Sequence, residues 1–297
     1  MADGRMKSAI LVTGAGGFIG RTLLPRLIGT FPLERVIGLD FRPRPPDWHG
    51  EWLEGGLERL TEVPGTFIVA HLAWDLRRGD PAAQEASLES FRAMLRIPGL
   101  AGVVGMGSAE EYGSAEGRLD ESRAPGNALS AYGRAKQDAF RAVAASGLRC
   151  IWLRPFIVYG EGQGGNMVVP YALRCAKEGC VAEFSSGDQF RDFVHVEDVA
   201  AGIAAAVRGV LTLPEGECRA CNLGRGAPVK VRDVLERIAR QTGREQLFRF
   251  GVRPMRAGEP AVQFAATDAA ESVLGWKAAI PWQEGIDRLC RNLEATK

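Results

Sequence analysis

A glycine-rich loop near the N-terminus, residues 13–20, reads T-G-A-G-G-F-I-G and separates two segments of different periodicity. The run that leads into it, Ser8 to Thr13 (SAILVT), is apolar and stops at a glycine, which is typical of a buried strand. From Gly17 to Ile28, apolar residues recur at helical spacing, and we expect Pro25 near a kink or an end of this helix. The sequence therefore predicts a strand, a tight loop and a helix in succession.

The acidic residue Asp40 lies twenty positions after Gly20, at the end of a second predicted strand that begins at Arg35. A glycine loop between a strand and a helix, followed by an acidic residue at this distance, is the fingerprint of a dinucleotide-binding fold. In this interpretation Gly14 permits the tight turn and Gly17 lets the backbone approach a pyrophosphate, while Gly20 allows close packing of helix and strand. The helix dipole and the free N–H groups at the helix start favour the anionic phosphates.

Asp40 favours NAD over NADP, because its carboxylate accepts hydrogen bonds from the adenine-ribose hydroxyls and repels a 2′-phosphate. Arg42 and Arg44 follow at once, and an arginine at this place can balance a 2′-phosphate. The other interpretation of the two arginines is a solvated loop. We therefore expect NAD as the cofactor, leave NADP open, and count Arg42 among the candidate cofactor-binding residues.

The first half of the chain alternates between strands and helices. Further strands are predicted at residues 52–54, 66–72, 103–106 and 149–155, and helices at residues 84–95 and 130–145. Alternation at these lengths indicates βαβ units, in which helices cover both faces of a parallel sheet. The predicted fold class is α/β, a Rossmann-type doubly wound parallel sheet.

The chain changes character after Pro155. A flexible loop, residues 160–165 (GEGQGG), precedes helices at 168–178, 199–208 and 231–242, a strand at 193–196 and an Arg-, Pro- and Gly-rich loop at 252–260. We predict a dinucleotide-binding domain over residues 1–160, with returning segments near 193–225, and a smaller, interleaved α/β substrate domain over 161–297. A cleft between the two is the expected ligand site.

Composition excludes several kinds of partner. The 297 residues are 46% hydrophobic and 25% charged, which is the range of globular proteins, and 37 Lys and Arg against 36 Asp and Glu leave a net charge of +1. A surface for nucleic acid or an anionic membrane needs a strong excess of positive charge. The apolar run from Ala9 to Val12 is far shorter than the ~20 residues of a membrane-spanning helix.

The six cysteines do not suggest a disulfide framework. The spacings Cys175-x4-Cys180 and Cys218-x2-Cys221 allow a four-thiolate zinc site, but both pairs lie in or beside ordinary predicted elements with no other metal ligand nearby. We expect no metal site and a reducing cytoplasmic location.

Tyr132 and Lys136 are four residues apart on the predicted helix at 130–145, so their side chains share one face. A phenol titrates near pH ~10 in water, and lowering its pKa to ~7 takes about 4 kcal/mol of preference for the phenolate. Lys136 and the positive nicotinamide ring of an oxidised cofactor can supply this preference. Ser108 follows the strand at 103–106, and the three side chains are the candidate catalytic residues.

With these motifs the sequence resembles the extended short-chain dehydrogenases/reductases, and within them the nucleotide-sugar epimerases, dehydratases and reductases. The resemblance covers essentially the whole chain. The matching motifs, besides the glycine loop and Asp40, are residues 71–73 (HLA), 108–113 (SAEEYG), 132–136 (YGRAK), 154–160 (RPFIVYG), 189–198 (QFRDFVHVED), 222–224 (NLG) and 274–276 (LGW).

The resemblance implies a role for each matching residue. Tyr132 is the general acid/base for a sugar hydroxyl, Lys136 holds the nicotinamide ribose and tunes Tyr132, and Ser108 hydrogen-bonds the reacting oxygen. The backbone of Phe18 and Ile19 contacts the pyrophosphate. The expected lining of the cofactor site is completed by Leu72, Ala73 and Pro155.

The resemblance also implies a pocket for a nucleotide-diphosphate sugar. Arg191 and Arg256 look like the arginines that clamp the diphosphate, and Asn166, Met167 and Asn222 are expected to line the same pocket. The alternatives are an ion pair of Arg191 with Asp192 or Asp198 and a solvated loop for Arg256. We assign Asp198 and Trp276 to a helix start and to core packing.

Departures from the family pattern narrow the range of reactions expected for this chain. The Asp-Glu pair that dehydratases carry after the catalytic Ser or Thr is Ala109-Glu110 here, where we expect Glu110 and Glu111 to be solvated or to cap a helix. Ile157 replaces a common Asn. Residues 55–57 (GGL) replace a Gly-Asp that contacts adenine in many members.

The expected function is therefore NAD(P)-dependent hydride transfer at C4 of a nucleotide-diphosphate hexose, as a 4-keto reduction or a 4-epimerisation. The alternatives are a nucleotide-sugar 4,6-dehydratase and a non-enzymatic NAD(P)-binding sensor. We expect a homodimer, because relatives often pair two helices per subunit, here the helices predicted at 84–95 and 130–145.

Overall fold

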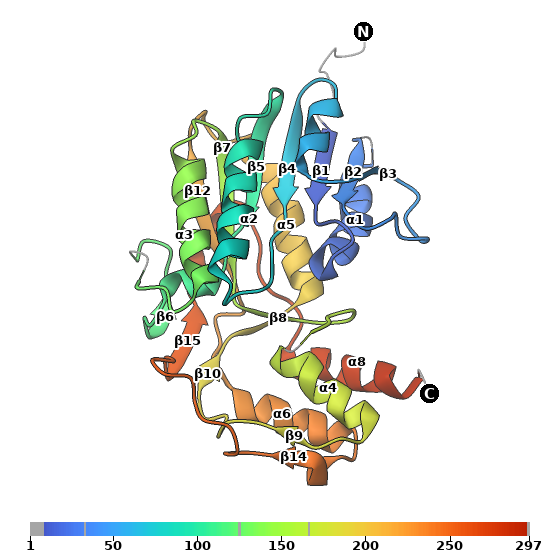
Figure 1. Cartoon of the computed structure of the whole chain (residues 1–297), viewed down its shortest axis with the longest axis vertical. Coiled ribbons are helices and arrows are strands. Elements are labelled where there is room, and N and C mark those ends of the chain that lie inside the picture. Colours follow the sequence, from blue (N-terminus) through green and yellow to red (C-terminus); the bar gives the residue numbers. More distant parts are fainter. Residues whose placement is uncertain (1–8, 33, 124–125, 166, 296–297) are drawn as a thin grey trace.

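The computed structural model describes residues 9–32, 34–123, 126–165 and 167–295. The chain forms a larger lobe around a parallel sheet and a smaller lobe below it, as Figure 1 shows. Within the described residues, no helix is both long enough and apolar enough to cross a membrane.

The larger lobe is built on a seven-stranded sheet in the order β12-β7-β5-β4-β1-β2-β3, and every neighbouring pair is parallel. Its strands are β1 (Ala9–Thr13), β2 (Val36–Asp40), β3 (Glu51–Glu54), β4 (Phe67–His71), β5 (Leu100–Met106), β7 (Arg149–Pro155) and β12 (Cys218–Leu223). The strand order reverses between β1 and β4, which is the switch point where open α/β sheets bind ligands at the carboxyl ends of their strands.

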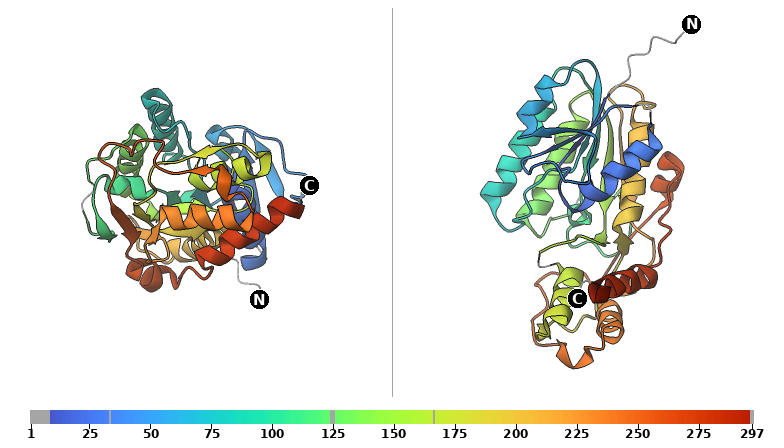
Figure 2. Two further views of the ribbon diagram at one scale, coloured as in Figure 1. Left: turned by 90° about the horizontal axis from the view of Figure 1, so that it is seen from below. Right: turned by 90° about the vertical axis from the view of Figure 1, so that its right-hand side faces the viewer.

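Helices cover both faces of this sheet, as the right-hand view of Figure 2 shows. One face carries α1 (Phe18–Thr30), α5 (Val196–Val210) and α7 (Asp268–Leu274), and the other carries α2 (Pro81–Met94) and α3 (Ala131–Ala144). The inner strands β1, β4, β5 and β7 are buried on both sides, so their apolar runs contribute to two separate cores. Two 3-10 turns, η1 (Leu57–Glu62) and η2 (Ala109–Tyr112), follow β3 and β5.

The smaller lobe has its own apolar core. Its helices are α4 (Val168–Glu178), α6 (Val231–Gln241) and α8 (Trp282–Ala295). Its main sheet has the order β13-β10-β15-β6, formed by Val229–Lys230, Phe190–Arg191, Val262–Ala265 and Gly117–Leu119. The remaining short elements are β8 (Ile157–Tyr159) paired with β11 (Phe193–His195), β9 (Ala182–Glu183) paired with β14 (Phe248–Arg249), and η3 (Glu245–Leu247).

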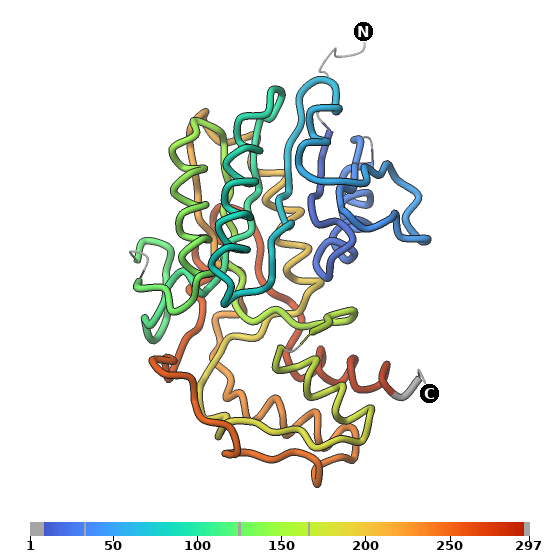
Figure 3. Tube along the Cα trace, in the orientation of Figure 1, coloured from blue at the N-terminus to red at the C-terminus, as the bar shows by residue number. Residues whose placement is uncertain are grey.

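The tube in Figure 3 shows that the chain passes between the lobes several times. It leaves the large sheet after β7, returns through β11 into α5, and later contributes α7, which packs against β12 and α5. The return to the larger lobe therefore extends beyond residues 193–225.

Pro25 lies inside α1, on its exposed side, so of the two places expected for it the end of the helix is excluded. The start of α5 differs from the expectation. Helix α5 begins at Val196, three residues earlier than predicted, because the Nδ1 atom of His195 accepts the N–H of Glu197 and caps the helix start. An imidazole is an unusual N-cap, so helical periodicity alone does not reveal it.

A buried ion pair joins η2 to strand β7 of the large sheet. The Nε of Arg154 donates to Glu111 over 2.8 Å, and the two side chains are 2% and 0% exposed. Glu111 also accepts the indole N–H of Trp152, over 3.0 Å. The carboxylate is therefore satisfied only as long as its partners on β7 stay in place.

We predict that Arg154→Met lowers the free energy of unfolding by about 3–5 kcal/mol, because it leaves a buried carboxylate without its cation. Denaturant unfolding followed by circular dichroism measures this loss. The matched control is Arg35→Met, whose pair with Glu51 is half-exposed and should contribute less than about 1 kcal/mol. Equal losses in the two variants would contradict the prediction.

Candidate active site

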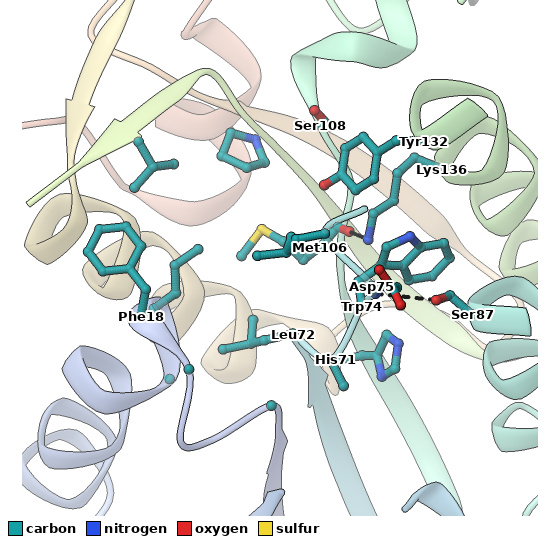
Figure 4. A pocket seen from close by; sticks show the side chains of 18 of the residues that line it. Phe18, His71, Leu72, Trp74, Asp75, Ser87, Met106, Ser108, Tyr132 and Lys136 are labelled. Atoms are coloured by element: carbon teal, nitrogen blue, oxygen red, sulfur yellow. Dashed lines mark hydrogen bonds between the residues drawn. The ribbon is translucent and has the colours of Figure 1, made fainter. Parts of the chain in front are cut away.

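A cavity of about 1970 Å³ opens at the carboxyl ends of the large sheet and reaches the smaller lobe. Figure 4 shows part of its wall, with Phe18 on one side and Ser108, Tyr132 and Lys136 on the other. The structure brings together on this cavity the following predicted site residues: Gly14, Gly17, Phe18, Ile19, Asp40, Arg42, Leu72, Ala73, Ser108, Tyr132, Lys136, Pro155, Met167, Arg191 and Arg256.

The glycine loop leaves no room for side chains. Gly14 has a φ of +66°, and a Cβ there would lie 2.8 Å from the backbone nitrogen of Ala73. At Gly20 a Cβ would lie 2.5 Å from the carbonyl oxygens of Gly14 and Ala15. The loop is thus pressed against the turn after β4 and against the first turn of α1, and its bare backbone forms the cradle that a pyrophosphate needs.

Thr13 joins the glycine loop to the turn after β4. Its hydroxyl accepts the N–H groups of Leu72 and Ala73, each over 3.2 Å, and lies 2.9 Å from the Nδ1 atom of His71. Burial, reinforced by the charge of Lys136, lowers the pKa of His71 to about 3, so this imidazole is neutral. It serves as an acceptor that orients the threonine hydroxyl.

Asp40 lies at the end of β2, as the fingerprint predicts. Its carboxylate accepts the N–H of Gly16 and the N–H of Arg42, each over 2.9 Å. These bonds hold the carboxylate at the rim of the glycine loop. The side chain of Arg42 is exposed, and its carbonyl accepts the indole N–H of Trp52.

The three candidate catalytic residues come from two elements. Ser108 is the N-cap of η2, and its hydroxyl accepts the N–H of Glu110 over 3.1 Å. Tyr132 and Lys136 lie one turn apart on α3, and both are buried. The ammonium of Lys136 donates to the carbonyl of Met106, at the end of β5, over 2.7 Å.

Charges of both signs lie around Tyr132 and shift its pKa in opposite directions. Burial is the largest effect and raises the pKa of Tyr132 to about 12; Arg78 lowers it, Glu110 and Glu111 raise it, and a hydrogen bond with Ser108 lowers it. Arg78 lies over the phenol ring, with its guanidinium carbon 4.8 Å from the ring centroid. The protein alone therefore keeps this phenol protonated near neutral pH.

Glu110 and Glu111 are neither simply solvated nor equivalent. Glu111 completes a capping box with Ser108 by accepting its N–H over 2.9 Å, and is fully buried. Glu110 forms an ion pair with Arg78 and accepts the hydroxyl of Ser130. Both carboxylates are engaged in the structure.

The two candidate diphosphate arginines differ in their surroundings. Arg191 is buried and donates to a carboxylate oxygen of Glu259 over 2.7 Å and to the carbonyl of Pro260 over 2.8 Å. Its pKa is lowered by burial and raised by Glu259. Arg256 is exposed and donates to the carbonyl of Leu129 over 3.3 Å.

The partners considered for Arg191 in the sequence are engaged elsewhere. Asp192 accepts the backbone N–H groups of residues 225, 226 and 265, and Asp198 accepts those of residues 279 and 280. Trp276 donates its indole N–H to the carbonyl of Asp198. Asp198 and Trp276 thus take the structural places assigned to them.

Asn222 does not reach the cavity, which corrects its assignment to the substrate pocket. It is fully buried, accepts the hydroxyl of Tyr112 over 2.8 Å, and donates to the carbonyl of Leu119 over 2.8 Å. Its side-chain amide links β12 to η2, through Tyr112, and to β6, through Leu119. Asn166, the other predicted asparagine, lies outside the described residues.

A histidine and two glutamates also lie close together, and one of them, Glu161, lines the cavity. One ligand-type atom each of Glu161, His195 and Glu197 lie within 4.8 Å of one another. Because the Nδ1 atom of His195 accepts a backbone N–H, its Nε2 carries the proton and lies 3.2 Å from a carboxylate oxygen of Glu161. We therefore assign this group to the capping of α5.

Among the cavity residues that were not recognised from the sequence, three come from one loop. Trp74 and Arg78 lie in the loop after β4 and face Lys136 and Tyr132, and Leu76 in the same loop is exposed. Only the position of this loop in the sequence could have indicated these residues. The loop follows a strand next to the switch point, where ligand-contacting residues gather.

The fold and the cavity define an NAD-dependent enzyme of the extended short-chain dehydrogenase/reductase class. The model of the NAD dependent epimerase/dehydratase family matches residues 10–224, and the chain belongs to this family. The predicted family, the Rossmann-type fold and NAD as the cofactor are thereby confirmed.

Relatives extend over nearly the whole chain. UDP-glucose 4-epimerase 3 of Oryza sativa subsp. japonica is 25% identical over 96% of this chain and 88% of its own length. The UDP-glucose 4-epimerase of Homo sapiens is also 25% identical, over 97% of this chain and 96% of its own.

Among solved structures, MoeE5 in complex with UDP-glucuronic acid and NAD superimposes with a TM-score of 0.86 at 27% identity, covering 98% of this chain and 100% of that one. MoeE5 has also been solved with UDP-glucose and NAD, with the same TM-score and identity. The predicted class of reaction, hydride transfer at C4 of a nucleotide sugar, is confirmed at the level of the family.

We predict that Gly14→Ala weakens NAD binding at least about tenfold and lowers the melting temperature, because a Cβ at positive φ forces the glycine loop away from Ala73. Isothermal titration calorimetry and thermal unfolding measure the two effects. Gly29→Ala is the matched control, since Gly29 lies in α1 and an added Cβ there would meet no atom within 4 Å. That variant should bind NAD normally. Normal NAD binding by Gly14→Ala would overturn the prediction.

Proposed function

We propose that the protein is an NAD-dependent 4-epimerase of a UDP-hexose or UDP-hexuronic acid. The observation that carries the proposal is the convergence of Ser108, Tyr132 and Lys136 on one wall of a cavity whose other end is the glycine loop. The names of the relatives support the choice of reaction and of nucleotide.

NAD, when bound, supplies the hydride acceptor for oxidation at C4. Tyr132 takes the proton of the C4 hydroxyl, Ser108 holds the same oxygen, and Lys136 stabilises the phenolate form of Tyr132. Inversion at C4 would require the hydride to return to the opposite face of the C4 carbonyl, while Tyr132 gives the proton back to the C4 oxygen. The ring must therefore turn while the diphosphate stays bound.

Arg191 and Arg256 are the proposed anchors for that diphosphate, from the smaller lobe. An arginine presents several donors in a fixed plane, which suits two adjacent phosphates. Arg191 already lies on the cavity wall with Glu259 as its partner. Binding of the diphosphate to Arg191 has to displace or share this carboxylate.

Engagement of Glu110 speaks against the dehydratase alternative. Elimination of a hydroxyl needs an acid beside the sugar that can give up a proton, and Ala109 has no such group. Glu110 is held by Arg78 and Ser130. The reductase alternative uses the same three residues and differs in the fate of the cofactor.

We predict that Tyr132→Phe lowers kcat by about 10²- to 10⁴-fold, because it removes the group that moves the proton. NAD binding should be retained, since the ring remains. The assay follows interconversion of UDP-glucose with UDP-galactose, and of UDP-glucuronic acid with its C4 epimer, by chromatography. Turnover within a few-fold of the unmodified protein would refute the assignment.

Cofactor balance separates epimerase from reductase. An epimerase converts UDP-sugars without net change in absorbance at 340 nm and without added reductant. A reductase consumes NADH in proportion to an added 4-keto sugar nucleotide. Stoichiometric oxidation of NADH with no epimerisation would replace the proposal by the reductase.

We also propose a homodimer in which α2 and α3 of each subunit face their counterparts. The exposed side of α2 carries small residues, Ala82, Ala86, Ser90 and Ala93, which permit close approach of another helix. For the compartment we propose the reducing cytoplasm, which suits the cysteine thiols on paired strands at Cys150 and Cys218.

Sedimentation equilibrium should give twice the chain mass for the unmodified protein, and Ala86→Arg should shift it to the monomer because a long charged side chain enters the interface. Gly29→Ala on α1 is the control and should remain dimeric. A monomer for the unmodified protein would rule the dimer out.

A further inference from the structure

Trp74 lies directly against the buried ammonium of Lys136. The Nζ atom of Lys136 is 3.6 Å from the centroid of the Trp74 ring and 5.5 Å from that of Tyr132. Figure 4 shows the three side chains gathered at one part of the cavity wall, with Lys136 hydrogen-bonded to the backbone of Met106. The indole face is therefore a part of the immediate surroundings of this lysine.

The indole is held in place independently of Lys136. Its N–H donates to the side-chain oxygen of Gln84 over 2.8 Å. The amide nitrogen of Gln84 donates in turn to the carbonyls of Asp75 and Arg77, over 3.0 and 3.1 Å. Gln84 lies on α2 and is only 2% exposed. The glutamine thus ties both the ring and the loop that carries it to a rigid helix.

Lys136 needs compensation for its burial. Burial lowers its pKa well below the usual value; Glu111 acts in the opposite direction, and Arg78 adds to the lowering. His71, from β4, is neutral at this site. An aromatic face attracts a cation through the negative charge density above the ring, and this attraction is strongest where water is excluded. Trp74 supplies it without adding a formal charge to the cavity.

We propose that Trp74 is a positioning residue, which keeps Lys136 charged and pointed at Tyr132, and that Gln84 positions Trp74. The proposal rests on the proposed function in one respect, the partnership of Lys136 with Tyr132. Its core, the stabilisation of the lysine cation by the indole face, is a property of the protein without substrate.

The first test is a titration of Lys136 in the full-length protein without substrate, by NMR of ¹³C-labelled lysine. Trp74→Leu should move the titration midpoint of Lys136 at least about half a pH unit lower, and Trp74→Phe should move it less, because a smaller ring face remains. Phe91→Leu is the matched control. Phe91 packs beside Trp74, with ring centroids 6.3 Å apart, so its loss loosens the same cluster without removing the indole. Equal shifts in Trp74→Leu and Phe91→Leu would overturn the proposal.

The second test is the pH profile of kcat. Oxidation of a hydroxyl needs the Tyr132 phenolate, so the rate rises with pH through the apparent pKa of Tyr132. A less charged Lys136 raises that pKa, and the midpoint for Trp74→Leu should move to higher pH, with kcat near neutrality about tenfold lower. The other groups around the phenol, Arg78, Glu110 and Glu111, are unchanged. A lower rate with an unmoved midpoint would show a merely structural role.

The third test applies if Trp74→Leu does not fold, because it leaves the fold of the protein intact. Fluorinated tryptophan weakens the negative face of every indole in the protein with little change in shape. In the unmodified protein, fluorination should lower the titration midpoint of Lys136 and weaken NAD binding. In Trp74→Phe it should change neither. Equal effects of fluorination in both proteins would contradict the proposal. Failure of the epimerase assay with a normal Lys136 response would refute the proposed function alone.

Discussion

One buried carboxylate, that of Glu111, holds the reacting groups in register with the sheet. It accepts the backbone N–H of Ser108, the indole N–H of Trp152 and the guanidinium of Arg154. The carbonyl of the same residue accepts the side chain of Gln137 from α3, over 2.7 Å. The helix that carries the catalytic pair, the turn that carries the serine and strand β7 therefore meet at Glu111.

The same wall of the site also depends on the loop between β4 and α2, which carries Trp74 and Arg78. Its backbone is pressed against Gly14 at one end and tied to Gln84 at the other. Between these points the carbonyl of Arg78 accepts the N–H of Tyr132, over 3.2 Å, so the loop also touches the start of α3. The glycine loop and the helix that carries Tyr132 and Lys136 are thus linked through one short segment, so a distortion at either end affects the other.

The large elements were predictable from the sequence because buried parallel strands are continuous apolar runs and their connecting helices are amphipathic. The glycine loop, Asp40 and the Tyr132–Lys136 spacing followed from local sequence in the same way. Short strands such as β10 and β13, of two residues each, have no periodicity to read. Asn222 was misplaced because a polar residue at a strand end looks the same whether it faces a cavity or the interior.

Trp74 escaped prediction for a different reason: its role exists only once α2 and α3 are packed side by side. The same packing decides the electrostatics of the site. One cation, Arg78, and two carboxylates, Glu110 and Glu111, act on the pKa of Tyr132 in opposite directions.

Burial then dominates, and the pKa of Tyr132 in the protein alone is about 12. Lowering this value to ~7 takes roughly 7 kcal/mol, more than a rearrangement of one side chain supplies. The positive ring of an oxidised nicotinamide, bound beside the phenol, would add a charge of the sign that lowers this pKa. Tyr132 should therefore act as a base only after the cofactor has bound. Burial keeps the Tyr132 phenol protonated in the empty site, and proton transfer then depends on NAD. The chain's net charge near zero suits this arrangement, because the positive charge that lowers the pKa of Tyr132 comes from the bound cofactor.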